Sequence, residues 1–126
     1  MENTSVQKVS TTSIMDSQSL YFLHHTDHYE SVVINHKLTF SNYVAWSRAF
    51  MLALLSWNKV EFIDRTVLKP ASIDLLFGPW IQCNNLILAW LMESITPPTA
   101  STIFYMDSIA DIWSNLKQNF GQLDYI

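Results

Sequence analysis

The sequence predicts an all-α protein, built as a small bundle of about four helices. Its 126 residues are the usual length of one domain. Hydrophobic residues make up 49% of the chain and aromatic residues 13%, which is enough to fill one core. Four segments carry apolar residues at helical spacing. Because each is apolar on one face, the segments are expected to bury these faces against one another.

The beginning of the chain differs in composition from the rest. Residues 1–19 are rich in Ser and Thr and have few large apolar side chains, so we expect a disordered arm there. Residues 20–126 are expected to form a single domain. Within it, the β-branched residues at 32–34 predict a short extended segment near 31–38. This segment is expected to lie along the helices or to pair with another chain.

The first predicted helix covers residues 42–58. Apolar residues recur along it at helical spacing and form one broad stripe. Ser41 or Asn42 is expected to cap its first turn by accepting a hydrogen bond from a backbone N–H. Residues 59–72 are expected to form a connector, because a proline near the end of this stretch breaks helices.

The second predicted helix covers residues 74–93; a start at Pro79 is the alternative, because proline suits the first turn of a helix. Pro97 and Pro98 are expected to stop it, because proline cannot continue a helix. A third, short helix is predicted over 99–105.

The last predicted helix covers residues 108–120 and has the clearest start. Ser108 and Asp111 have the spacing of a capping box, with Asp in place of the preferred Glu. Gly121 is expected to end the helix in the left-handed conformation. Both ends of this helix are thus predicted from local sequence signals.

Charge and cysteine content narrow the classes of function. The net charge is −4 and the seven basic residues are scattered, whereas a domain that grips nucleic acid by itself usually carries a basic patch. We therefore expect no direct nucleic-acid binding by this segment. Charged residues are only 14% of the chain, below the usual quarter, which favours an apolar partner surface. Cys83 is the single cysteine, so an internal disulfide is excluded and a reducing compartment is expected.

The sequence shows no sign of membrane insertion or secretion. Its longest apolar runs, 49–55 and 86–92, are far shorter than the roughly 20 residues that span a bilayer. The N-terminus lacks the basic start and apolar stretch of a signal peptide. We therefore expect an intracellular, cytoplasmic protein that does not bind membranes.

A search for reactive groups predicts no catalytic, cofactor-binding or metal-binding residue. Asp27 stands among the histidines, but no HExxH spacing and no cysteine partner accompany them, so a polar turn is the better interpretation. The two glycines exclude a nucleophile elbow and a Gly-rich phosphate loop. Asp107 and Asp111 are expected to favour the positive end of the last helix rather than to act as acid and base. We expect no enzyme and no cofactor. The four histidines are His24, His25, His28 and His36.

Four segments, in this order and at these distances, resemble one family. They are YFLHHTDHYESVVINHKLTFSNYVAWSRAF at 21–50, NKVEFID at 58–64, WIQCNNLILAWLMESI at 80–95 and ADIWSNLKQNFGQ at 110–122. Taken together they resemble the N-terminal region of the Gag-like proteins of plant Copia-type LTR retrotransposons. Each motif alone is a tryptophan or phenylalanine on an amphipathic helix, so the joint order and spacing carry the resemblance.

The resemblance implies a function and a set of signature residues. It implies a non-enzymatic, helical capsid-type domain that self-associates into a particle around element RNA. A second interpretation is that a host retained such a domain as a protein- or peptide-binding module. The signature residues, expected in the core, are Trp46, Phe62, Trp80, Cys83, Trp90, Trp113, Leu116 and Phe120.

The chain also departs from the family pattern. The family usually has Pro-Gly at 29–30, Gly at Phe40 and Gly at Arg65. Loss of these glycines constrains the backbone wherever a positive φ is needed. Relatives continue into further helices beyond Ile126. The resemblance therefore predicts a diverged or degenerate copy, truncated at its C-terminus.

Overall fold

A computed structural model describes residues 19–21 and 36–121, and it confirms the all-α class. No strand occurs within these residues. Each of the four predicted helices has a counterpart, with ends that shift by a few residues. The predicted arm at 1–19, except for Ser19, and residues 31–35 of the predicted extended segment at 31–38 fall outside the described residues. The elements are α2 (Tyr43–Ser56), η2 (Val60–Phe62), α3 (Phe77–Glu93), α4 (Pro97–Ile103), α5 (Ile109–Leu116) and the π-helical turn η3 (Lys117–Gly121).

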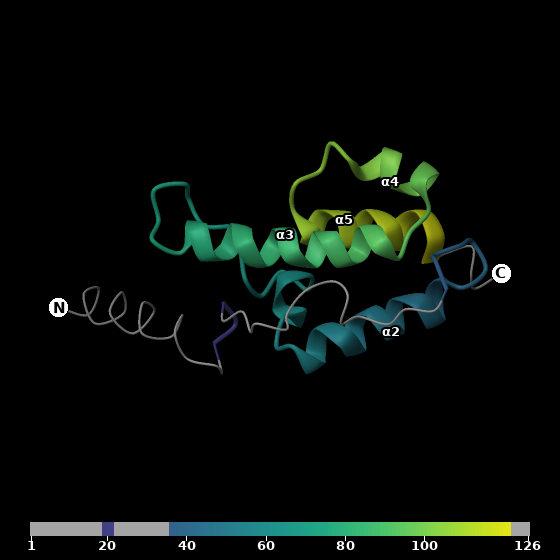
Figure 1. Ribbon diagram of the computed structural model, residues 1–126, viewed down its shortest axis with the longest axis horizontal. Coiled ribbons are helices and arrows are strands. Elements are labelled where there is room, and N and C mark those ends of the chain that lie inside the picture. Colours follow the sequence, from purple (N-terminus) through teal and green to yellow (C-terminus); the bar gives the residue numbers. More distant parts are fainter. Residues whose placement is uncertain (1–18, 22–35, 122–126) are drawn as a thin grey trace.

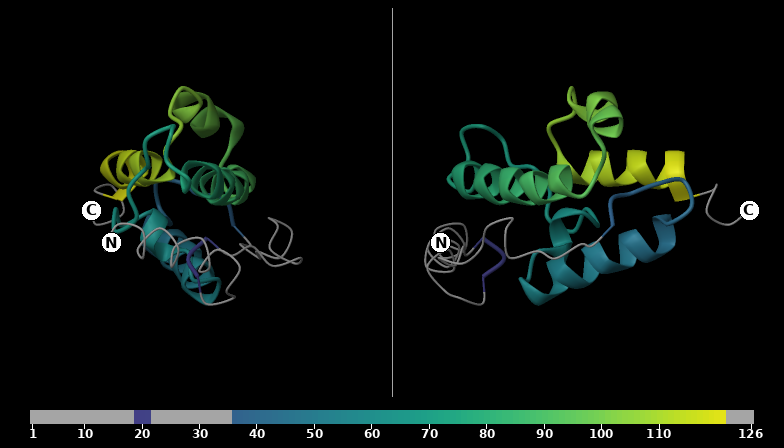
Figure 2. Two further views of the ribbon diagram at one scale, coloured as in Figure 1. Left: turned by 90° about the vertical axis from the view of Figure 1, so that its left-hand side faces the viewer. Right: turned by 45° about the vertical axis from the view of Figure 1, so that its right-hand side comes forward.

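The helices pack around one shared core. α3 and α5 lie side by side, α2 packs beneath them, and the short α4 lies on the side away from α2 (Figures 1 and 2). Buried apolar residues of all four helices and of η2 join one hydrophobic cluster. This arrangement places the connector between η2 and α3 next to the start of α5.

The beginning of α2 differs from the predicted cap. Asn42 precedes the helix, but its side chain makes no capping hydrogen bond. Its Oδ1 instead accepts from Thr39 N at 2.7 Å, and its Nδ2 donates to Lys37 O at 2.9 Å. The prediction that Ser41 or Asn42 caps α2 is therefore wrong, because the Asn42 amide closes the preceding turn.

The two prolines have a second role that the prediction missed. Pro97 and Pro98 form the first turn of α4, where the backbone N–H groups have no helical partner in any case. The Thr96 side chain caps this turn by accepting from Thr99 N at 3.4 Å. The helix therefore begins and ends two residues earlier than the predicted range of 99–105. As a result, Phe104 lies beyond its end and is exposed.

The beginning of α5 is held by a residue of another helix. Ser108 makes no side-chain cap, so the predicted capping box with Asp111 is wrong. Asn84, buried in α3, takes that role: its Oδ1 accepts from Ile109 N at 2.8 Å, and its Nδ2 donates to Asp107 O at 2.7 Å. One amide side chain thus fixes α5 against α3.

Gly121 is favoured by close packing rather than by backbone conformation. No glycine has a positive φ, so the predicted left-handed helix end is wrong. A Cβ atom at position 121 would lie 3.2 Å from Cε2 of Tyr43, closer than side chains normally approach. Of the two described family departures, only Arg65 has a positive φ, at 69°. Phe40 instead stacks on Phe120, with ring centroids 4.6 Å apart.

Candidate functional site

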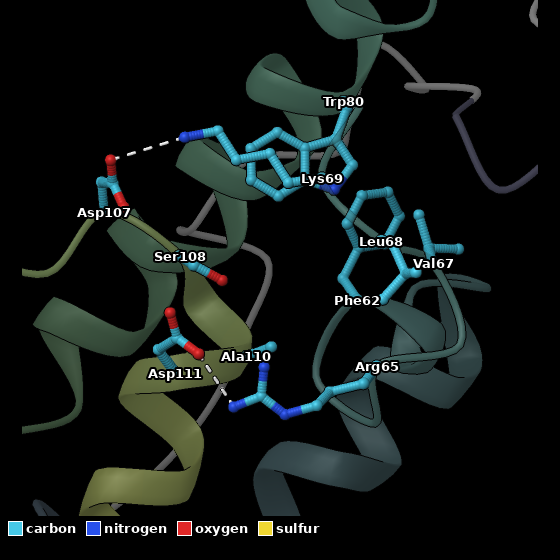
Figure 3. A pocket seen from close by; sticks show the side chains of 10 residues that line it. All are labelled: Phe62, Arg65, Val67, Leu68, Lys69, Trp80, Asp107, Ser108, Ala110 and Asp111. Carbon is cyan, nitrogen blue, oxygen red and sulfur yellow. Dashed lines mark hydrogen bonds and ion pairs between the residues drawn. The ribbon is translucent and has the colours of Figure 1, made fainter. Parts of the chain in front are cut away.

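A pocket of about 310 Å³ lies between the connector after η2, the first turns of α3 and the start of α5 (Figure 3). Buried aromatic rings form its floor, and charged side chains of the connector and of α5 form its rim. The lining residues are Phe62, Arg65, Val67, Leu68, Lys69, Trp80, Asp107, Ser108, Ala110 and Asp111.

Trp80 contributes a polar group to this apolar floor. The indole is buried, and its Nε1 has no hydrogen-bond acceptor among the residues that the structure describes. Figure 3 shows the indole nitrogen on the ring edge that faces Phe62. A buried donor without an acceptor is uncommon, because the loss of its hydration is not compensated. We call the Nε1–H of Trp80 the open donor.

Two ion pairs line the rim of the pocket. Arg65 donates to Asp111 Oδ1 at 2.8 Å, and Lys69 Nζ lies 3.6 Å from Asp107 Oδ2. Lys69 also lies over the Trp80 ring, 5.8 Å from its centroid. All four charged side chains are about half exposed or more, so each pair contributes only about 0–1 kcal/mol to stability. Their charges cancel, and the rim has no net charge.

Arg65 reaches the rim from a strained position. Its φ of 69° lies in the left-handed region, which costs a residue with a side chain about 1–2 kcal/mol. The guanidinium thereby meets both Asp111 and Ser114 Oγ, the latter at 3.3 Å. The sequence indicated this position only as a departure from a family glycine. It did not indicate that Arg65 and Asp111 meet.

The signature residues divide between the core and the pocket. Seven of the eight are buried, and Trp113 is half-buried. The Trp113 ring stacks on Trp46, with ring centroids 5.6 Å apart, and contacts Phe50, with centroids 5.5 Å apart. Two signature residues, Trp80 and Phe62, line the pocket.

A second tryptophan joins three parts of the chain. The Nε1 of Trp46 donates to the backbone oxygen of Ser94 at 3.0 Å. The same oxygen accepts from Leu38 N, also at 3.0 Å. Ser94 therefore ties the segment before α2, α2 itself and the end of α3 together. Sequence patterns did not indicate this role, because a backbone acceptor has no signature.

Cys83 is fully buried in α3, beside Tyr21. Its Sγ lies 3.7 Å from the backbone oxygen of Tyr21. Burial raises the pKa of the Tyr21 hydroxyl above its usual 10.0, and the nearby Cys83 and Asp74 raise this pKa further. The Tyr21 ring packs edge-on against Phe62, with centroids 5.9 Å apart.

The histidine candidates lie mostly beyond the described residues. His24, His25 and His28 fall there, and His36 is exposed. Within 19–21 and 36–121, no three His, Cys, Asp or Glu side chains are grouped to hold a metal ion. Over the same residues, no helix has both the length and the apolar character needed to cross a membrane.

Comparison with known proteins gives one family match. Residues 24–71 match the family described as the Gag-polypeptide of LTR copia-type. This stretch of the chain is thus similar to a copia-type Gag region, and it includes α2, η2 and most of the connector that lines the pocket. No curated protein and no solved structure matches the chain. A plant origin and an N-terminal position in a longer polyprotein stay predictions.

Proposed function

We propose that the chain is a non-enzymatic, Gag-like structural domain of a Copia-type element, and that its copies associate with one another. The observation that carries this proposal is the family match over residues 24–71. Gag-like regions of such elements are structural rather than catalytic, according to the resemblance. The proposed partner is another copy of the chain.

The surface of α2 supports this proposal. The helix lies inside the matched segment and buries one face in the core. Its outer surface exposes Met51, Leu52 and Leu55, and Arg48 is its single charged residue. Residues 48, 51, 52 and 55 lie at the spacing of one helical face. An exposed apolar face with so little charge suits contact between helices of two copies.

The mass in solution tests self-association. We expect light scattering after size exclusion to show discrete dimers or larger assemblies of the full chain as concentration rises. The double substitution Leu52→Lys and Leu55→Lys should reduce the mass, because it places two charges on the α2 face. A matched control is Ile73→Lys, at an exposed apolar residue of the connector. A monomer at every concentration would contradict the proposal.

A second candidate function is a host-retained protein- or peptide-binding module. The pocket with the open donor favours it, because buried polar groups without partners are the groups that ligands satisfy. Genomic context separates the two candidates. Flanking long terminal repeats and polymerase remnants would favour the element, whereas an isolated and regularly expressed gene would favour the host module.

A further inference from the structure

We propose that the pocket binds a neutral, apolar peptide segment, whose side chain fills the aromatic floor and whose carbonyl oxygen accepts from the open donor of Trp80. This proposal rests on the second candidate function and specifies its ligand. It does not depend on the proposed self-association through the outer face of α2, which is a different surface.

The open donor indicates that the ligand carries an acceptor. Trp46, buried to the same extent, donates to a backbone carbonyl, which shows the kind of partner that an indole N–H takes in this fold. The Nε1 atom of Trp80 has almost no exposed surface of its own. A carbonyl therefore reaches it once a covering side chain moves. Lys69 lies over the Trp80 ring, and it and Leu68 are exposed lining residues of the connector, so movement of either would leave the core intact.

The rim indicates that the ligand is neutral. Arg65 and Lys69 are each paired with a carboxylate of the α5 region, so no cation is left for a phosphate or a carboxylate. An anionic ligand would have to displace Asp107 or Asp111 and would then lie beside the displaced charge. A peptide group avoids this repulsion. Its N–H can also donate to Asp107, whose carboxylate has unused acceptor positions.

The floor and the size of the pocket indicate an apolar side chain. Phe62 and Trp80 are buried beneath it, and Val67, Leu68 and Ala110 complete its apolar wall. Ligand pockets usually measure roughly 300–1,000 Å³, so about 310 Å³ is at the lower limit. This volume suits one anchor residue with its adjoining peptide groups.

The indole N–H signals of the full-length, ¹⁵N-labelled chain test the proposal. The probe is N-acetyl-leucinamide, which is neutral and presents one leucine side chain between two carbonyl groups. We expect the Trp80 signal, assigned with Trp80→Phe, to move downfield to saturation as the N–H gains an acceptor. The Trp90 signal is the internal control: it also lacks an acceptor among the described residues, but it does not line the pocket. A Trp80 signal that stays in place would overturn the proposal.

Two further probes test the chemistry of the ligand. N-acetylglycinamide keeps the carbonyl groups but lacks the side chain, and N-acetyl-leucine is an anion at neutral pH. Both should bind more weakly than N-acetyl-leucinamide. Equal or tighter binding of N-acetyl-leucine would contradict a neutral ligand, and equal binding of N-acetylglycinamide would contradict an apolar anchor.

A pair of surface substitutions tests the location without threatening the fold. Leu68→Ala should weaken the binding of N-acetyl-leucinamide about fivefold, because it removes part of the apolar wall. Leu75→Ala is the matched control: the two leucines are 72% and 69% exposed, and only Leu68 lines the pocket. Equal effects of the two substitutions would place the site elsewhere.

The outcomes also separate this proposal from the function on which it rests. Probe-induced shifts at other residues, with Trp80 unmoved, would overturn the pocket as the site and leave a peptide-binding module in place. The absence of shifts anywhere in the chain would count against both. A dilution series of the protein without any probe identifies the source of the peptide segment. If the Trp80 signal moves with protein concentration alone, the segment belongs to a second copy of the chain.

Discussion

Trp46 and Trp80 are both 3% exposed, yet they have different surroundings. The indole of Trp46 donates to Ser94 O, an oxygen that Leu38 N also reaches, so its polar group closes a junction between three segments. The indole of Trp80 lies in the floor of the pocket, and the open donor has no acceptor among the described residues. Burial alone therefore does not separate a tryptophan that completes the fold from one that a ligand can complete. A missing acceptor together with a position at the pocket distinguishes Trp80, because Trp90 also lacks an acceptor among the described residues but does not line the pocket.

The largest expected effect comes from removing the Trp46 side chain, which joins three segments through Ser94 O. Trp46→Ala removes a buried ring and the hydrogen bond to Ser94, so we expect the free energy of unfolding to fall by about 3–5 kcal/mol. Urea denaturation followed by circular dichroism measures this. Leu52→Ala, at an exposed site of the same helix, should change it by less than about 0.5 kcal/mol. A small effect at Trp46 would show that the junction does not hold the fold together.

A second, intermediate effect is expected beside the pocket. Asn84→Ala leaves both Ile109 N–H and Asp107 O without their partner, and we expect a loss of about 2–3 kcal/mol in unfolding free energy. Hydrogen exchange at the Ile109 amide should accelerate at the same time. The neighbouring Asn85→Ala is the control, because Asn85 is exposed and its side chain accepts a longer, 3.3 Å hydrogen bond from Asn84. Similar losses for the two variants would refute the role assigned to Asn84.

The smallest effect concerns the strained rim. Arg65→Gly and Arg65→Ala both lose the ion pair with Asp111, so their difference isolates the backbone. We expect the glycine variant to be more stable by about 1 kcal/mol, because glycine adopts a positive φ without strain. At Arg48, inside α2, we expect the opposite: the alanine variant should be more stable than the glycine variant by about 1 kcal/mol. Thermal unfolding of the four variants decides the point, and a glycine advantage at both positions would contradict it.

Periodicity predicted the helices because each helix buries one face. The spacing of Trp46, Phe50 and Leu54 is a property of the local sequence, and all three residues are buried in α2. The match to the copia-type Gag family over 24–71 likewise agrees with the resemblance seen in the motifs. The predicted helices depend on short-range order, which one sequence contains.

Two of the three predicted helix ends failed because they depend on neighbours that are distant in sequence. Ser108 has good capping chemistry, but the buried Asn84 of α3 meets the first N–H of α5 instead. Asn42 bonds backward into its own turn, and Gly121 makes room for Tyr43. The roles of Asn84 and Gly121 follow from tertiary packing, which a local pattern does not contain, whereas Asn42 is engaged by a competing local turn.

The pocket was likewise not predictable from the sequence. It brings Arg65 and Lys69 of the connector next to Asp107 and Asp111, about 40 residues away in the chain. The local pattern predicted only that Trp80 belongs to the core. Whether its indole finds an acceptor depends on the complete fold.

The comparison of the two tryptophans is tested most directly by making the same substitution at both. Trp46→Phe and Trp80→Phe each remove an indole N–H and leave an aromatic ring in the core. At Trp46 a formed hydrogen bond is lost, whereas at Trp80 a buried donor without an acceptor is relieved. The account predicts that Trp46→Phe lowers the free energy of unfolding by about 1–3 kcal/mol more than Trp80→Phe does. Equal losses, or a larger loss at Trp80, would contradict it.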